Sequence, residues 1–297
     1  MNLPGERELP RTRESSLAKV LKEAAQVLEQ AGVPVPRLTA EVLLCNVLGV
    51  DKSFLYAHPE YDLSRDQDER FRTNLERRCQ GEPTQYITGV QEFHGLEFKV
   101  TPDVLIPRPE TEHLVEEALA RAQDAQTILD VGTGSGCVAV SIKKNLPSAR
   151  VVAGELSRAA LRVAAENSRC LQAPVEFVRA DLVEAFSAGS FDMVVCNPPY
   201  VPLADLPGLQ RELRSEPSVA LFGGEDGLRI YERLAVTIAR ILKPGGWLLL
   251  ELGYRALPAV EALIRGPQWS EPAVKADLAG IDRVLAVQRI EQAHHPV

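Results

Sequence analysis

The chain has 297 residues, 45% of them hydrophobic and 25% charged, which predicts a folded protein with a core of ordinary size plus an appended module. Its formal net charge of −8 argues against broad electrostatic capture of phosphates, so stable nucleic-acid binding is not expected. The five cysteines are widely spaced and form no CxxC pair, which argues against a disulfide framework or a metal site and favours a reducing compartment.

The first part of the chain predicts a helical module. Residues 1–12 are polar and contain proline, unlike a signal segment, and no apolar run of the chain is long enough to cross a bilayer. From Ser15 to about Arg78, apolar residues recur at helical spacing, with breaks at Gly32–Pro34 and Gly49–Ser53. We predict a helical bundle over residues 1–84, in a cytoplasmic protein that has no membrane partner and is a monomer by default.

Charge says little about the role of this bundle. Acidic residues slightly outnumber basic ones in it, so a nucleic-acid clamp is not expected. The bundle is either a packing module or a surface that docks a partner.

A β-prone segment follows the bundle. After Gly81-Glu82-Pro83 come two short stretches, Gln85–Thr88 and Leu96–Val100, separated by Glu92–Gly95. This pattern predicts a hairpin that links two domains across residues 85–106. His94 lies at the predicted turn, where a structural role is expected.

From Thr127 onward, apolar runs alternate with helical segments, which is typical of an α/β domain with a doubly wound, Rossmann-like parallel sheet. We assign residues 107–297 to this domain. Strands are expected at Thr127–Val131, Arg150–Gly154, Val175–Val178, Phe191–Cys196, Trp247–Leu252 and Arg283–Val287, and helices at Gly136–Asn145, Arg158–Cys170 and Gly227–Leu242. Right-handed crossovers would bring the loops after the first, second and fourth strands to one edge of the sheet, where we expect one site.

The first strand runs into a glycine-rich loop, whose backbone a ligand can approach closely. Its sequence is Gly132-Thr133-Gly134-Ser135-Gly136, and Cys137 stands where the dinucleotide fingerprint requires glycine. Asp130, at the end of the strand, suits a ligand with an ammonium and a sulfonium better than a pyrophosphate. These features favour S-adenosylmethionine over NAD, the alternative being a tight turn without a ligand.

Two further positions are candidates for cofactor contacts. Glu155 closes the second strand, where a carboxylate can accept hydrogen bonds from ribose hydroxyls. Asp181 and Leu182 follow the third strand, where they could offer an acceptor to the adenine amino group and an apolar contact to its face.

Asn197-Pro198-Pro199-Tyr200 directly follows the fourth strand and is the candidate catalytic loop. The two prolines stiffen it and remove two backbone donors, so the remaining carbonyls and the Asn197 oxygen can accept hydrogen bonds from a planar NH2 group. Tyr200 could stack against that group or fill the core. A sulfonium methyl donor is already activated, so direct in-line transfer needs no side-chain nucleophile. The loop alone leaves open whether the NH2 belongs to glutamine or to adenine.

With these residues assembled, the chain resembles the protein-glutamine N5-methyltransferases that act on peptide chain release factors. The resemblance covers nearly the whole chain. Beyond the loops, it is carried by the segments Gly81–Gly89, Ile106–Glu112 and Glu216–Leu228, the last of which runs from Glu216-Pro217 through Gly223–Leu228. Ile106–Glu112 is highly specific to this family, whereas the Asn-Pro-Pro-Tyr loop is shared with adenine amino-methyltransferases.

The resemblance implies a seven-stranded methyltransferase domain behind a helical, substrate-docking bundle, the two being joined by a β-hairpin. It implies that the enzyme methylates the glutamine of the Gly-Gly-Gln motif in release factors, which modulates translation termination. It also implies cofactor contacts from Gly132–Gly136, Glu155, Leu182 and Asn197, and a glutamine amide held by Asn197–Tyr200. Glu155 stands where most relatives have Asp, which keeps the carboxylate on a longer side chain. The alternatives are an adenine amino-methyltransferase on RNA or DNA and a catalytically silent cofactor-binding scaffold.

Overall fold

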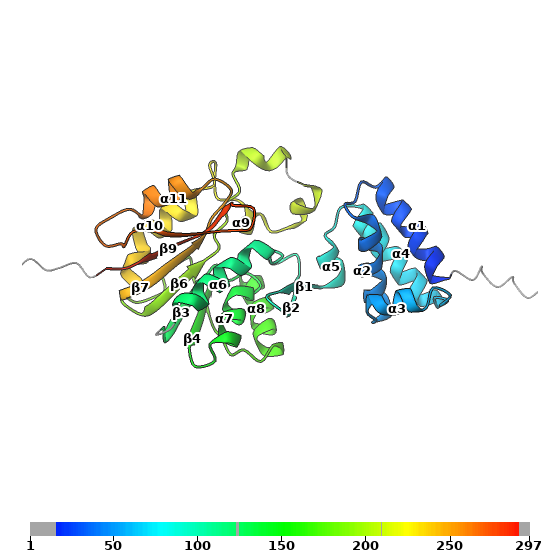
Figure 1. The fold of residues 1–297 in the computed structure, drawn as a ribbon, viewed down its shortest axis with the longest axis horizontal. Coiled ribbons are helices and arrows are strands. Elements are labelled where there is room, and N and C mark those ends of the chain that lie inside the picture. The colour runs from blue at the N-terminus through cyan, green and yellow to red at the C-terminus, as the bar shows by residue number, and fades with distance from the viewer. Residues whose placement is uncertain (1–15, 123–124, 209, 291–297) are drawn as a thin grey trace, which may run out of the picture. The chain divides into compact units, whose positions relative to one another are not determined.

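The computed structural model describes residues 16–122, 125–208 and 210–290. The polar stretch of residues 1–12 lies outside them. The chain forms two compact units, Met1–Thr88 and Gly89–Val297, each drawn in Figure 1. No helix within the described ranges is long and apolar enough to span a membrane.

The first unit is a helical bundle, as predicted. Its helices are α1 (Leu17–Gln30), α2 (Pro36–Leu48), α3 (Lys52–Ala57), α4 (Arg65–Cys79) and α5 (Thr84–Thr88). The apolar stripe of α1 is buried against the other helices, and the predicted breaks fall between α1 and α2 and between α2 and α3. Gly49 ends α2 in the left-handed region, and a capping box at Ser64 begins α4.

The prediction of a strand over Gln85–Thr88 was wrong, because this stretch is helical and forms most of α5. Tyr86 and Ile87 are buried in the helix, and Ile87 packs into the core of the bundle, so tertiary packing overrides their β propensity. The hairpin itself consists of β1 (Val90–Phe93) and β2 (Leu96–Lys99). Its two-residue turn places His94 and Gly95 at φ 51° and 72°, the positive values that a tight hairpin requires.

The second unit is built on a seven-stranded sheet of order β5-β4-β3-β6-β7-β9-β8. The strands are β3 (Thr127–Val131), β4 (Arg150–Glu155), β5 (Glu176–Arg179), β6 (Phe191–Cys196), β7 (Leu242–Glu251), β8 (Ala273–Ala276) and β9 (Asp282–Gln288). The first five strands are parallel to one another, which confirms the doubly wound fold. β9 is antiparallel to β7 and pairs with β8 as a hairpin, so the last predicted strand runs opposite to its neighbour.

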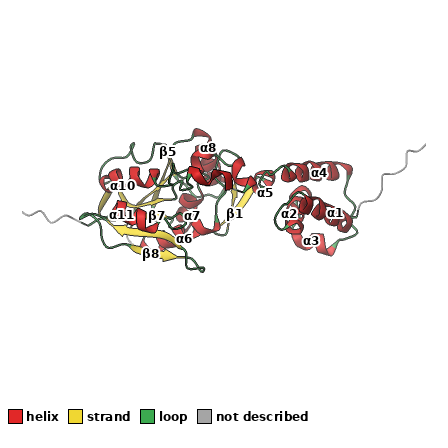
Figure 2. Ribbon diagram, turned by 90° about the horizontal axis from the view of Figure 1, so that it is seen from above, coloured by secondary structure: helices red, strands yellow, loops and turns green. Residues whose placement is uncertain are grey.

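Helices cover both faces of this sheet (Figure 2). Residues of α6 (Glu112–Arg121) and α7 (Cys137–Asn145) pack on one face, and residues of α10 (Arg229–Ile241) and α11 (Leu257–Ile264) pack on the other. Successive residues of β3 alternate between the two clusters, with Ile128 in the first and Leu129 in the second. α8 (Arg158–Cys170) contacts α7 and the hairpin strand β2.

Short elements complete the second unit. They are the 3-10 turns η1 (Pro109–Thr111), η2 (Leu203–Gly208) and η3 (Arg211–Ser215) and the helix α9 (Ser218–Leu221). β8 was not predicted, because this edge strand is mostly exposed and lacks an apolar run. The wall of the sheet's carboxyl edge is formed in part by the segment that leads into η1 and by the segment around α9.

Candidate functional site

A cavity of about 490 Å³ opens at the carboxyl ends of β3, β4 and β6, which is large enough for a drug-sized ligand. The predicted site residues that line it are Asp130, Gly132, Thr133, Gly134, Ser135, Glu155, Asp181, Leu182, Asn197, Pro198 and Pro199. Gly136 and Tyr200 are not among the described residues of its wall. The glycine-rich loop and the Asn-Pro-Pro loop therefore face the same space.

The glycine-rich loop has a conformation that requires glycine. Gly132, Gly134 and Gly136 have φ of 74°, 56° and 83°, in the left-handed region. A Cβ at Gly132 or Gly134 would meet no protein atom beyond the adjacent residues within 4 Å, so these two glycines leave open space for a ligand. Gly136 instead packs closely, because a Cβ there would lie 3.1 Å from that of Ala164 on α8.

Asp130 braces this loop from inside. Its Oδ2 accepts hydrogen bonds from Thr133 Oγ1 at 2.6 Å and from the Ala139 amide at 3.2 Å. Burial raises the pKa of the Asp130 carboxyl to about 7, although both hydrogen bonds favour its charged form. The hydrogen bonds give Asp130 a structural task that sequence reasoning did not assign, and its attraction for a cationic cofactor stays a prediction.

Glu155 is bound to the same loop. Its two carboxylate oxygens accept the Gly134 amide at 3.1 Å and the Ser157 amide at 2.8 Å. The side chain is only partly buried and lines the cavity, and its contact with ribose hydroxyls stays a prediction. The longer Glu side chain thus keeps a carboxylate at the end of β4.

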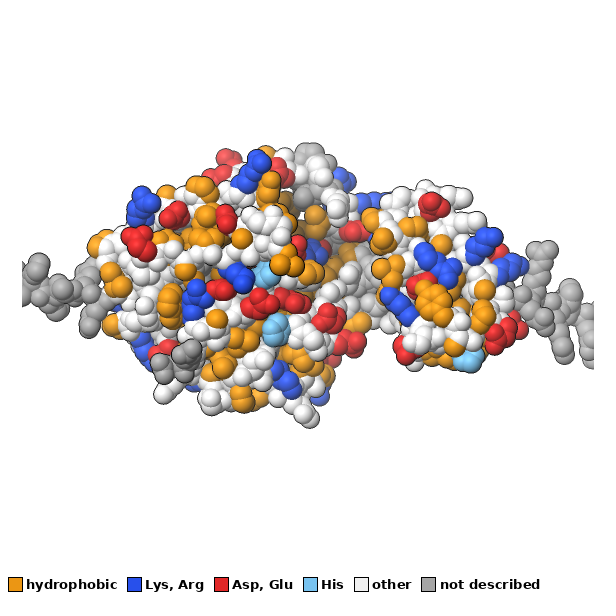
Figure 3. All heavy atoms as spheres, viewed as in Figure 1, with side chains coloured by type: hydrophobic (Ala, Val, Ile, Leu, Met, Phe, Trp, Pro, Cys, Tyr) orange, Lys and Arg blue, Asp and Glu red, His pale blue; other side chains and the backbone are white. Residues whose placement is uncertain are grey.

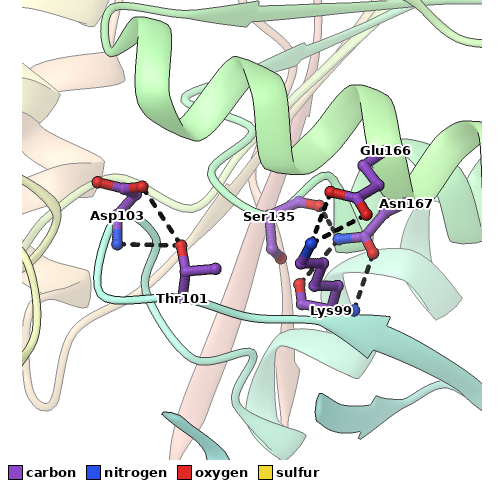
Figure 4. Close-up of polar contacts among 6 residues, drawn as sticks. All are labelled: Lys99, Thr101, Asp103, Ser135, Glu166 and Asn167. Atoms are coloured by element: carbon purple, nitrogen blue, oxygen red, sulfur yellow. Dashed lines mark hydrogen bonds and ion pairs between the residues drawn. The ribbon is translucent and has the colours of Figure 1, made fainter. Parts of the chain in front are cut away.

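Asn167 on α8 fastens the loop to the hairpin (Figure 4). Its Nδ2 donates to the carbonyls of Ser135 at 2.8 Å and Lys99 at 3.0 Å, and its Oδ1 accepts the Lys99 amide at 2.8 Å. The Lys99 ammonium also pairs with Glu166 at 2.8 Å. One buried amide therefore satisfies three backbone groups and fixes the end of β2 against the glycine-rich loop.

Asp181 and Leu182 lie on the cavity wall next to α10. Asp181 forms an ion pair with Arg233 at 2.9 Å, and Leu182 adopts a positive φ of 50°. The ion pair holds the Asp181 carboxylate toward Arg233. Their predicted contacts with an adenine ring remain predictions.

Asn197 is oriented by a residue from a distant segment. Its Nδ2 donates to Thr111 Oγ1 at 3.1 Å, and Thr111 is buried at the junction of η1 and α6. With the NH2 end of the amide engaged in this way, the Oδ1 end is the acceptor of Asn197 that remains. Pro198 is buried and Pro199 half-buried, and neither has an N–H that could compete for an acceptor.

Three glycines allow the chain to close tightly around this loop. A Cβ at Gly223 would lie 2.6 Å from the Pro199 carbonyl oxygen, and a Cβ at Gly227 would overlap the Tyr200 carbonyl oxygen. At Gly253 a Cβ would lie 3.0 Å from the Tyr200 ring. The resemblance segment Gly223–Leu228 therefore has a steric function, because only glycine fits against the backbone of the loop.

Tyr200 is partly buried and packs against the core cluster that includes residues of β7, and it does not line the cavity. Burial raises the pKa of its hydroxyl, so the phenol is neutral at ordinary pH. The position of the ring favours the alternative in which Tyr200 fills the core. Stacking against a substrate stays a prediction.

Sequence reasoning gave no individual role to the residues of Ile106–Glu112, although it singled out the segment. Arg108 forms an ion pair with buried Glu216 at 2.5 Å, and the Ile106 amide donates to the same carboxylate at 3.1 Å. The segment Ile106–Glu112 and the segment that begins at Glu216 are thus joined next to the cavity wall. Charged residues of opposite sign in two distant segments were the signal that could have suggested this pair.

Comparison with known proteins agrees with this architecture. Residues 19–89 match the family model described as the PrmC N-terminal domain, and residues 110–206 match the methyltransferase small domain. A methyltransferase of known structure from Pyrococcus furiosus has a TM-score of 0.51 and 16% identity over 77% of this chain and 100% of that chain, which reflects a shared fold.

Curated relatives extend over almost the full length of the chain. The release factor glutamine methyltransferase of Koribacter versatilis is 45% identical over 91% of this chain and 97% of its own length. That of Moorella thermoacetica is 44% identical over 93% of this chain and 100% of its own length. At this identity and coverage, and with a glycine-rich loop and an Asn-Pro-Pro-Tyr loop at one edge of its sheet, the chain belongs to the release factor glutamine methyltransferases.

Proposed function

We propose that this enzyme transfers a methyl group from S-adenosylmethionine to the side-chain amide nitrogen of the glutamine in the Gly-Gly-Gln motif of peptide chain release factors. The observation that carries the proposal is the cavity at which the glycine-rich loop and Asn197 meet, in a chain that belongs to this family. We further propose that residues 1–84 dock the protein substrate.

Several features of the cavity wall support the proposed cofactor. Gly132 and Gly134 leave room for close approach to the backbone, and Glu155 offers carboxylate oxygens at the end of β4. Asp181 and Leu182 line the wall beyond the end of β5, the strand that pairs with β4, and we propose that adenine is held there. When bound, S-adenosylmethionine would supply a methyl group that is already activated by its sulfonium.

Asn197 would orient the substrate amide. Its Oδ1 accepts one hydrogen of the glutamine NH2, and a carbonyl of the Asn-Pro-Pro stretch accepts the other. Two acceptors in fixed positions draw the nitrogen lone pair out of resonance and hold it toward the methyl donor. The nitrogen loses its proton after the methyl group has been transferred.

Charge favours a protein substrate over a nucleic acid. The net charge is −8, and on the face shown in Figure 3 the Lys and Arg side chains are interspersed with Asp and Glu side chains. An adenine amino-methyltransferase would be expected to carry a basic recognition surface and stacking aromatics.

The proposal is tested by offering labelled S-adenosylmethionine to the purified protein with release factors, with ribosomal RNA and with DNA in separate reactions. We expect label on the release factor, and none on a matched release factor whose Gly-Gly-Gln glutamine is replaced by alanine. Label found only on nucleic acid would overturn the assignment and favour the adenine reaction.

A further inference from the structure

The orientation of the Asn197 amide needs an explanation. The oxygen and nitrogen ends of an asparagine amide have nearly the same shape, so packing alone does not decide which end faces the cavity. Thr111 could bind either end, because a hydroxyl both donates and accepts. In the structure Thr111 Oγ1 accepts from Asn197 Nδ2. This arrangement is fixed only if the proton of the Thr111 hydroxyl is directed to another acceptor.

Glu251 provides that acceptor. It is the last residue of β7, and its neighbour Leu250 pairs with Cys196, the residue before Asn197. Glu251 is 1% exposed; this burial raises the pKa of its carboxyl group, and the neighbouring hydroxyls of Thr111 and Tyr200 lower it. Oε2 of Glu251 is buried and has no hydrogen-bond partner among the described residues, so this carboxyl group has unused capacity as an acceptor.

The residues around Glu251 are consistent with an anchoring role. Arg283 is the nearby positive charge and Glu110 the nearby negative one, and the Cys196 thiol and Tyr231 hydroxyl lie buried in the same region. The Tyr231 hydroxyl donates to the Glu251 carbonyl at 2.7 Å and accepts the Gly253 amide at 3.3 Å, which fixes the backbone here.

We propose that Thr111 and Glu251 are positioning residues that set the Asn197 amide with its oxygen toward the substrate. Glu251 accepts a hydrogen bond from the Thr111 hydroxyl, Thr111 Oγ1 accepts one from Asn197 Nδ2, and Asn197 Oδ1 is left to accept one from the substrate NH2. Hydrogen bonds in such a chain polarise one another, so Oδ1 becomes a stronger acceptor. The inference rests on the proposed function. It also gives the segment Ile106–Glu112 a task at the reaction site.

The test compares Thr111→Val, which keeps the shape but removes the hydroxyl, with the matched control Thr111→Ser, which keeps the hydroxyl. We expect kcat for release-factor methylation to fall about 10- to 100-fold in T111V and to stay within about threefold of wild type in T111S. Because Thr111 is not predicted to hold the cofactor, the Kd for S-adenosylmethionine should change by less than about threefold in both T111V and T111S.

The second part of the test uses Glu251→Gln. The new amide can direct an N–H toward Thr111, which weakens the preference for one orientation of the Asn197 amide. We expect E251Q to lower kcat in the same sense, and T111V combined with E251Q to be no worse than T111V alone, as for residues that act in one chain. Equal kcat in wild type, T111V and T111S would overturn the inference. Losses of kcat that add up in the double variant would also overturn it. So would a loss of kcat in T111V that is fully explained by weaker cofactor binding or by a lower melting temperature.

If T111V does not fold, Thr111→Ala takes its place against T111S and is read in the same way. Wild-type protein serves as the internal check on the proposed function. Failure of wild type to label any release factor would reject the proposed function. Normal wild-type labelling with an unaffected T111V would reject only the inference about Thr111 and Glu251.

Discussion

The glycine-rich loop and the Asn-Pro-Pro-Tyr loop face one cavity but are held in place in different ways. Asp130 bonds to Thr133 and Ala139, which are 3 and 9 positions away in the chain, and Gly134 bonds to Glu155, 21 positions away. Asn197 depends on Thr111, 86 positions away. The glycine-rich loop is therefore held by residues 3 to 32 positions away in the chain, whereas Asn197 depends on a segment 86 positions away.

This difference suggests how one fold supports many methyl acceptors. A loop whose contacts come from the central strands and helices of the domain can stay the same while more distant segments change. A loop that is braced by distant segments takes its orientation from them, and those segments can differ between glutamine and adenine enzymes. Substitutions in the two regions should therefore separate cofactor binding from methyl transfer.

The largest separation is expected at the chemistry loop. Replacing Asn197 with alanine removes the proposed acceptor for the substrate amide, so methyl transfer should fall about 100-fold or more, by analogy with the loss of one preorganised polar contact. Cofactor affinity should change much less. Single-turnover kinetics and calorimetric titration with S-adenosylmethionine measure the two effects, and unchanged turnover would remove Asn197 from the mechanism.

A steric change should act on the same loop from a distance. Gly223→Ala places a Cβ 2.6 Å from the Pro199 carbonyl oxygen, so the loop must shift. We expect about a 10-fold or greater loss of activity and about 1–3 kcal/mol of lost stability. Gly208→Ala is the matched control, because a Cβ there meets nothing within 4 Å, and its stability should stay within about 0.5 kcal/mol of wild type. Equal behaviour of the two variants in denaturant unfolding would contradict the steric account.

On the cofactor side, Glu155→Ala should mainly weaken binding. Loss of hydrogen bonds to a charged acceptor costs about 1.5–3 kcal/mol, so the Kd for S-adenosylmethionine should rise about 10-fold or more. Glu155→Asp keeps the carboxylate and should lose less. The account of Glu155 fails if titration calorimetry shows the alanine variant binding as tightly as wild type.

The smallest effect concerns pH and involves one buried carboxyl group in each region. Burial raises the pKa of Asp130 and of Glu251 to about 7, above their values in the unfolded chain. The folded protein therefore binds more protons between about pH 4 and 7, and the stability these groups contribute is lost as pH rises through 7. Asp130→Asn and Glu251→Gln should each flatten the fall in melting temperature between pH 5 and 8. A wild-type slope in both variants would argue against the raised pKa values.

Sequence patterns predicted the parts of the molecule that are determined locally. The apolar runs Thr127–Val131 and Phe191–Cys196 and the glycine-rich loop carry their structure in adjacent residues, and the fold confirmed them as β3, β6 and the turn before α7. The same reasoning failed for Gln85–Thr88, because burial within the helical bundle determined its structure. It missed β8, because an exposed edge strand lacks the apolar pattern.

The partners of Asn197 could not be predicted for a related reason. Thr111 meets Asn197 because η1 lies near the end of β6, and the proposed link from Thr111 to Glu251 depends on the register in which β6 and β7 pair. A shift of one residue in that register would move the Glu251 side chain to the other face of the sheet. Such relationships arise from tertiary packing and leave no spacing signal in the sequence.

The most direct measurement is mass spectrometry of a release factor after incubation with this protein and S-adenosylmethionine, with N197A protein in parallel. We predict one added methyl group on the side-chain amide of the Gly-Gly-Gln glutamine with wild-type protein, and at most a trace with N197A. A methyl group on another residue, or equal modification by both proteins, would contradict the assignment of Asn197 and its loop to this reaction.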